Sequence, residues 1–235
     1  MTYKLSVACI VLSVIGTAPL FAAELPIRRP EQVLTTEHLN FAPGGTIRFD
    51  KSFGDLYVEG WDQPQVEMTL IKLFQDYDPP KNPAEHLQAV KFTTEHPSAT
   101  ELVIGTTIPP HRFFRHPFGG KGPVDVRYEL RLPRDSHLVI HHGGGNILIG
   151  NITGNIEATN REGDIVLMLP DPGPFSIDAR SKMGTVISDF AGQAHVRHLI
   201  GEGFASADAN SPRRIFLRVG FGGITIKDVP REALP

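Results

Sequence analysis

The fold is decided by a short phrase that recurs in the second half of the chain. It reads Gly-Asn-Ile-Leu-Ile-Gly at residues 145–150, Gly-Asn-Ile-Glu-Ala at 154–158 and Gly-Asp-Ile-Val-Leu at 163–167. Glycine adopts a positive φ without steric cost, and Asn or Asp bonds to nearby backbone, so the pair predicts a sharp corner before a strand. We expect six glycines to have this structural role at corners: Gly54, Gly145, Gly154, Gly163, Gly184 and Gly223.

Strands that follow such corners are predicted to stack on one another. A single strand with its corner has too little apolar surface to be stable alone, whereas stacked neighbours share a core and pair their backbones. The prediction is an all-β fold, a β-solenoid or β-roll-like stack of short strands. A β-sandwich is the alternative, because the later copies of the phrase are irregularly spaced. The apolar positions expected to face the core are Ile147, Ile149, Ile165, Leu167, Ile224 and Ile226.

The chain before the repeats also alternates apolar and polar residues. Residues 24–133 are predicted to form a β-meander, interrupted by a short helix at 82–89 and a long loop at 109–123. The repeat part covers 134–235, and the whole of 24–235 is expected to form a single domain. The 23 glycines and 20 prolines agree with many turns between short strands.

The amino end has the layout of a secretory signal peptide. One positive charge, Lys4, precedes an apolar run at 5–16, and small residues at 22–23 offer a cleavage site. The run is too short for a membrane-spanning helix, which needs about 20 apolar residues. Residues 1–23 are therefore predicted to be removed, which makes the protein exported: periplasmic, at the cell surface or secreted, and peripheral to a membrane at most. A retained amino-terminal anchor is the alternative.

Composition limits the classes of partner. The only cysteine, Cys9, lies in the leader, so the mature chain has no disulfides. The full chain has 23 basic and 26 acidic residues, which is not the charge balance of a protein that binds nucleic acid. No nucleic-acid partner is predicted.

No catalytic, cofactor-binding or metal-ligating set is recognisable. His141 and His142 are neighbours, so on a strand they point to opposite faces and cannot easily share a metal. A Gly-x-Ser-x-Gly nucleophile motif is absent. Aspartates recur through the repeats without the tandem pattern of calcium-binding rolls, so we interpret them as corner residues. They are Asp164, Asp171, Asp178, Asp189 and Asp208.

Aromatic side chains are the candidates for a contact surface, because exposed aromatics supply much of the energy in recognition. Two are on an early strand, and three are in the 109–123 loop. Trp61 could equally be a core residue, and the loop aromatics could equally fold over the core as a lid. The candidates are Tyr57, Trp61, Phe113, Phe114 and Phe118.

Residues 53–62 (Phe-Gly-Asp-Leu-Tyr-Val-Glu-Gly-Trp-Asp), residues 128–133 (Tyr-Glu-Leu-Arg-Leu-Pro) and the glycine-led strands after them occur in a characteristic order. In this order the chain resembles the bacterial putative-adhesin domain family, an exported domain of unknown function with repeated Gly-Asp-Ile strands. The resemblance implies a β-solenoid or β-roll in the cell envelope or outside the cell, with no catalytic residue and no cofactor.

The functional hypothesis is an exported, non-enzymatic, adhesin-like protein that serves as a binding or structural scaffold. Its partner would be an envelope component, a polysaccharide or another protein. The alternative is a carbohydrate-active enzyme on a β-helix scaffold, which would show a groove lined by several carboxylates.

Overall fold

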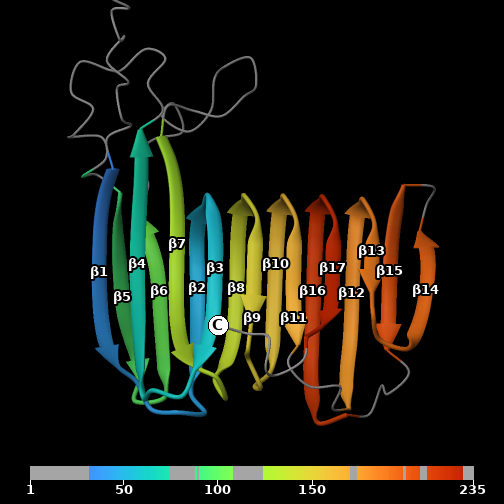
Figure 1. The fold of residues 1–235 in the computed structure, drawn as a ribbon, viewed down its shortest axis with the longest axis horizontal. Helices are drawn as coiled ribbons and strands as arrows, with labels where there is room; N and C mark the ends of the chain where they lie inside the picture. The colour runs from blue at the N-terminus through green and yellow to red at the C-terminus, as the bar shows by residue number, and fades with distance from the viewer. Residues whose placement is uncertain are drawn as a thin grey trace, which may run out of the picture.

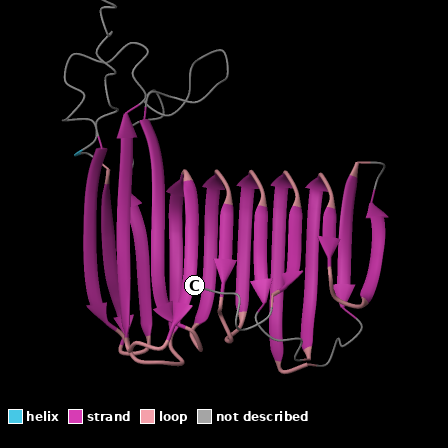
Figure 2. Ribbon diagram, in the orientation of Figure 1, coloured by secondary structure: helices cyan, strands magenta, loops and turns pink. Residues whose placement is uncertain are grey.

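The computed structural model describes residues 32–74, 88, 90–107, 124–169, 174–197, 200–206 and 211–229. This part of the chain is all-β and consists of two mixed sheets, one of eight and one of nine strands (Figure 2). The predicted signal peptide and the 109–123 loop lie outside the described residues, as does the 82–89 helix apart from Gln88. Within the described ranges, no helix is long and apolar enough to span a membrane.

The two sheets interleave strands from distant parts of the chain. In spatial order, sheet A contains β1 (Gln32–Asn40), β4 (Gln65–Phe74), β7 (Val124–Pro133), β3 (Asp55–Trp61), β9 (Ile147–Gly150), β11 (Ile165–Leu169), β17 (Ile224–Asp228) and β13 (Val186–Ser188). In spatial order from the end next to β1, sheet B contains β5 (Lys91–Ser98), β6 (Glu101–Thr107), β2 (Thr46–Phe53), β8 (His137–Gly144), β10 (Ile156–Glu162), β16 (Arg213–Phe221), β12 (Phe175–Met183), β15 (Gly201–Ser206) and β14 (Gly192–Arg197).

Five strand pairs form the centre of the molecule. In each pair the first strand belongs to sheet B and the second to sheet A, and neighbouring pairs run parallel. The corners within the pairs lie along one edge of the molecule (Figure 1). Their spatial order differs from their chain order, because β16–β17 lies between β10–β11 and β12–β13. In the sequence, β12–β13 and the β14–β15 hairpin come before β16–β17, yet β16–β17 lies between β10–β11 and β12–β13 in space.

The prediction of a β-meander before the repeats is wrong. A meander needs consecutive antiparallel neighbours, but β4 and β5 are in different sheets, and so are β6 and β7. Instead, β6 runs parallel to β2 and β7 runs parallel to β3, so this segment continues the central stack. Alternation alone could not reveal this, because a strand has the same period of two in either arrangement.

The core lies between the two sheets and is built from the inward positions of the alternating strands. All six repeat positions predicted to face inward are at most 1% exposed, which confirms that prediction. Phe49 of sheet B meets Tyr128 of sheet A edge to face, with ring centroids 5.4 Å apart. Full burial of one such side chain stabilises the fold by about 1.5–3 kcal/mol.

Glycine at each corner is required by both conformation and space. Positive φ occurs at five corner positions: Gly54 (113°), Gly145 (113°), Gly163 (114°), Gly184 (148°) and Gly222 (136°). A Cβ at Gly145 would lie 2.1 Å from the carbonyl oxygen of Gly54, so successive corners stack in direct contact. In the last copy of the phrase, the positive φ belongs to Gly222 and not to Gly223. Gly154 precedes a sheet B strand instead, and a Cβ there would lie 2.1 Å from the Ser136 oxygen.

The small polar residue after the corner glycine links neighbouring pairs. Asp55 Oδ1 accepts a hydrogen bond from the Asn146 backbone N–H at 3.0 Å, and Asn146 Oδ1 accepts one from the Asp164 N–H at 3.1 Å. Asp164 Oδ1 then accepts from the Gly223 N–H at 2.7 Å. The recurrent Gly-Asn and Gly-Asp dipeptides therefore connect each corner to the next.

A row of buried polar side chains lies just inside the corners. Asn160 donates through Nδ2 to the Gly145 carbonyl at 2.8 Å, and Ser181 donates to the Gly222 carbonyl at 2.7 Å. His142 contacts the Gly54 carbonyl through Nε2 at 2.7 Å and the Ser52 hydroxyl through Nδ1 at 2.6 Å. We call these residues the inner polar row: Ser52, His142, Asn160 and Ser181.

His142 is the titratable member of the inner polar row. Its side chain is only 4% exposed, and burial lowers its pKa to about 4. Because the Gly54 carbonyl can only accept, Nε2 carries the hydrogen and Nδ1 accepts from Ser52. The neutral imidazole therefore satisfies both partners.

Candidate binding face

The predicted aromatic candidates do not form one cluster in the described structure. Tyr57 is 37% exposed on the outer face of sheet A, with the Arg127 guanidinium 5.4 Å from its ring centroid. Trp61 is half-buried and donates from Nε1 to the Gln65 carbonyl at 2.9 Å, which ties β3 to the start of β4. Glu59 lies between them on β3, and burial raises the pKa of its carboxyl. Phe113, Phe114 and Phe118 lie outside the described residues.

A second surface has a more distinctive composition. It is the outer face of three adjacent strands of sheet B, β10, β16 and β12, where alternation directs every second side chain to solvent. It carries five cations and two carboxylates, although the chain as a whole has more acidic than basic residues. We call this surface the basic face: Glu157, Thr159, Arg161, Ser176, Asp178, Arg180, Lys182, Arg214, Phe216, Arg218 and Gly220.

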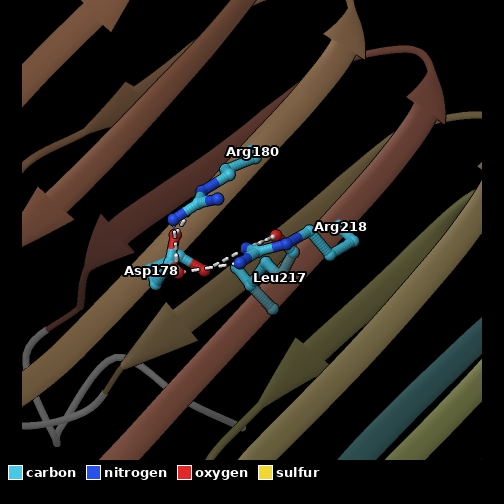
Figure 3. Close-up of polar contacts among 4 residues, drawn as sticks. All are labelled: Asp178, Arg180, Leu217 and Arg218. Carbon is cyan, nitrogen blue, oxygen red and sulfur yellow. Dashed lines mark hydrogen bonds and ion pairs between the residues drawn. The ribbon is translucent and has the colours of Figure 1, made fainter.

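Asp178 organises the centre of the basic face (Figure 3). Arg180 binds its carboxylate with two parallel bonds, Nε to Oδ1 at 2.9 Å and Nη2 to Oδ2 at 3.0 Å. Arg218 on the neighbouring strand donates from Nη2 to Oδ2 at 2.7 Å and from Nη1 to the Asp178 and Leu217 carbonyls, both at 2.8 Å. One carboxylate thus orients two guanidinium groups, and the three side chains together carry a net positive charge.

The position of Arg218 is also set by an aromatic ring. Its guanidinium carbon lies 3.5 Å from the centroid of Phe216, which is a close cation–π contact. Phe216 remains 39% exposed. The ring and the oriented guanidinium therefore present apolar and cationic surface side by side.

Two further cations flank a glycine at the corner end of the face. On β12, the residues on either side of Lys182 pair with Val219 and Phe221 of β16, so Lys182 lies opposite Gly220. On β10, the residues on either side of Arg161 pair with the same two residues of β16, so Arg161 also lies opposite Gly220. No side chain lies between Arg161 and Lys182, because a Cβ at Gly220 would lie 2.5 Å from the Arg161 carbonyl oxygen. In the part of the chain that the structure describes, no ion pair involves Arg161, Lys182 or Arg214.

The outer face of β2, β6 and β8 differs, because its two acidic side chains each contact a basic one. Asp50 Oδ1 lies 2.6 Å from His141 Nδ1. Arg48 Nη2 lies 3.5 Å from Glu101 Oε1. Asp50 and Glu101 thus each have a nitrogen partner on a neighbouring strand, whereas the basic face has cations without ion pairs in the described structure.

Sequence reasoning missed the basic face. Asp178 was expected to form a corner, but it lies within β12, between Ile177 and Ala179 of the core. Asp164 does lie at a corner, whereas Asp171 and Asp208 are outside the described residues. A usable signal was the alternation of charged residues at 178, 180 and 182 and at 214 and 218. The alternation could not show that β16 is adjacent to β12.

The described residues contain no group of three or more His, Cys, Asp or Glu side chains that could hold a metal ion. His142 is enclosed in the inner polar row, and His141 is paired with Asp50 on the other face of the same strand. The two histidines therefore point apart, as their adjacency on a strand predicts.

No protein-family model matches the chain, and no curated protein matches it. Among solved structures, a putative cell adhesion protein from Clostridium sporogenes is 14% identical, with 86% of this chain and 100% of that one covered and a TM-score of 0.47. A putative adhesin from Bacteroides fragilis is 12% identical, with coverage of 86% and 99% and a TM-score of 0.25. A putative lipid binding protein from Parabacteroides distasonis is 12% identical, with coverage of 68% and 58% and a TM-score of 0.24. At these scores none of the similarities decides the function of the chain.

Proposed function

We propose that this protein is an exported, non-enzymatic, adhesin-like scaffold that acts in the cell envelope or outside the cell through the outer faces of its sheets. The observation that carries the proposal is the basic face, where cations without ion pairs in the described structure surround an oriented Arg-Asp-Arg group. Behind it the inward residues of β10, β12 and β16 are buried in a packed core. Recognition would therefore occur on the surface of the sheet.

The scaffold itself is proposed to be a β-roll formed by residues 24–235 as one domain. Parallel pairing of successive strand pairs and the contact between their glycine corners support this description over a β-sandwich. The corner glycines would then have a purely structural role. Residues 1–23 would be removed on export, and sequencing the amino end of the exported protein tests this.

A second contact surface is proposed on the outer face of sheet A, where Tyr57 is exposed. Trp61 remains a candidate for this surface, and Phe113, Phe114 and Phe118 remain candidates for a contact surface. The partner would be an envelope component, a polysaccharide or another protein. Partner binding through a flat face requires no catalytic group.

One pair of side chains bears on the enzyme alternative. Glu157 and Asp178 lie in one row on either side of Phe216, and glycosidases use two carboxylates that face each other across a sugar. However, both oxygens of Asp178 accept hydrogen bonds from guanidinium groups. The Asp178 carboxylate is thus engaged in binding two arginines, which favours recognition over proton transfer.

The test is capture of the exported protein on envelope fractions and immobilised polysaccharides, alongside assays for release of reducing ends. We expect capture without hydrolysis. A variant with Phe113, Phe114 and Phe118 changed to Ser serves to assign or exclude that loop, with circular dichroism as the control for folding. Hydrolysis by the wild type, abolished by Asp178→Asn, would show that the non-enzymatic proposal is wrong.

A further inference from the structure

The basic face has cations that no group of the described structure neutralises. Arg161, Lys182 and Arg214 have no ion pair among the described residues, and the Arg180–Asp178–Arg218 group adds one more net positive charge. One carboxylate, Glu157, opposes them without an ion pair of its own in the same part of the chain. Because the whole chain is acidic, this excess of cations is local. It indicates an anionic partner.

The four cations nearest the corners lie on three adjacent strands. Arg180 and Arg218 are paired across adjacent strands, and Arg161 and Lys182 flank Gly220 two residues farther along. Adjacent strands are about 4.8 Å apart, and residues on one face of a strand recur about every 6.8 Å. The cations therefore span several strands, which suits an extended anionic chain better than a single small anion.

The remaining side chains of the face suit sugar rings. Phe216 offers a partly exposed aromatic ring beside Arg218. Glu157 and Asp178 flank that ring in the same row, and Thr159 is next to Arg218. Carboxylate and hydroxyl oxygens accept hydrogen bonds from sugar hydroxyls.

From these contacts we propose that the basic face binds a linear acidic polysaccharide, with its carboxylate groups on Arg161, Lys182, Arg180 and Arg218 and a sugar ring against Phe216. This inference rests on the proposed function, because it names the ligand of the same face. Arginine binds carboxylates through several N–H donors, and Arg180 uses only Nε and Nη2 for Asp178, which leaves its Nη1 donors for a ligand carboxylate.

An anionic membrane fits the face less well. Two exposed apolar side chains lie near its corner end, Phe221 at 54% and Met183 at 43% exposed. They alternate away from the basic face, because inward and outward positions exchange at each residue. The cations and these apolar groups would therefore not meet one planar membrane together.

The experiment is a calorimetric titration of the exported protein with three acidic polysaccharides: polygalacturonate, hyaluronate and heparin. Neutral dextran, duplex DNA and phosphatidylglycerol vesicles are the comparison probes. The variant Arg161→Gln/Lys182→Gln removes two cations that have no ion pair in the described structure, so the fold should be retained. The matched control Lys91→Gln/Lys227→Gln removes the same charge from exposed sites on β5 and β17.

We expect at least one of the acidic polysaccharides to bind and dextran not to bind. The variant on the face should lose affinity by about tenfold or more, and the matched control should stay within about twofold of the wild type. Phe216→Leu should lower polysaccharide affinity several-fold, because it removes the ring but keeps an apolar side chain.

Three results would overturn the inference. They are failure of all three acidic polymers to bind, equal affinity of the face variant and the wild type, and equally tight binding of DNA or vesicles. If envelope fractions still capture the protein in any of these cases, the proposed adhesin-like role stands. The first and third results would then make the ligand class wrong, and the second would make the basic face the wrong site. Absence of all capture would instead contradict the binding role itself.

Discussion

The inner polar row and the basic face are two polar regions of sheet B that share strands β10 and β12 and differ in burial. Asn160 and Arg161 are neighbours on β10, yet Asn160 is 1% exposed and Arg161 points to solvent. Ser181 and Lys182 show the same contrast on β12. A buried polar group must be satisfied by the protein, whereas an exposed one is satisfied by water and is free to meet a partner. Stability therefore depends on the first region, and recognition is proposed for the second.

The largest effect is expected at the corners that the inner polar row supports. Gly222→Ala should lower the free energy of unfolding by about 4 kcal/mol, because φ is 136° and the Cβ would lie 2.3 Å from the Gly163 carbonyl oxygen. The adjacent Gly223→Ala is the control, since its Cβ would meet nothing closer than 3.6 Å. Urea unfolding of both variants measures the difference. Equal losses would show that the corner does not need glycine at 222.

The next largest effect is expected from the pH dependence of stability, which reports on His142 in the inner polar row. An unfolded histidine takes up a proton near pH 6.5, whereas folded His142 does so only at about 4. The stabilisation is therefore complete above pH 6.5 and is lost as the pH falls from 6.5 to 4, by about 3 kcal/mol. Unfolding of wild type, His142→Gln and His141→Gln should be followed over this range. If His142→Gln retains the same pH dependence as the wild type, the assignment is wrong.

Adjacent substitutions on β10 give the most direct comparison. Asn160→Ala should lower the free energy of unfolding by about 1–3 kcal/mol, because it leaves the buried Gly145 carbonyl without its side-chain donor. Arg161→Ala should change it by about 0.5 kcal/mol or less, since its side chain is exposed. Thermal or urea unfolding measures both. A larger loss for Arg161→Ala would remove the distinction between the two regions.

A small stability effect is also expected for Asp178→Asn. Asp178 is 38% exposed in its ion pairs with Arg180 and Arg218, so the loss should stay below about 1 kcal/mol. The basic face becomes more positive, and affinity for an acidic polysaccharide should rise a few-fold. Titration with the same polymers measures this. A stability loss of about 3 kcal/mol would place Asp178 with the structural residues instead.

Part of the candidate face could be predicted from local sequence. Alternation places Asp178, Arg180 and Lys182 on one side of a strand without any tertiary information. The contact between Arg218 and Asp178 required the β16–β12 pairing, which joins segments separated by the β13, β14 and β15 strands. Long-range pairing of this kind leaves no periodic mark in either strand. The signal peptide at 1–23 and the aromatics at 113, 114 and 118 stay predictions.

The all-β class, the inward positions and the existence of glycine corners follow from the amino-acid sequence, because a period of two and the Gly-Asx pair act within a few residues. Even the choice of corner glycine, 222 and not 223, needed the structure, since neighbouring glycines are equivalent locally. Only the tertiary structure decided three other features. They are the position of β16–β17 between two earlier strand pairs, the parallel pairing of β6 and β7 in place of a meander, and the clustering of cations on one face. All three features depend on which strand pairs with each strand edge. Local sequence does not determine this pairing, because any strand with matching alternation can satisfy the same backbone groups.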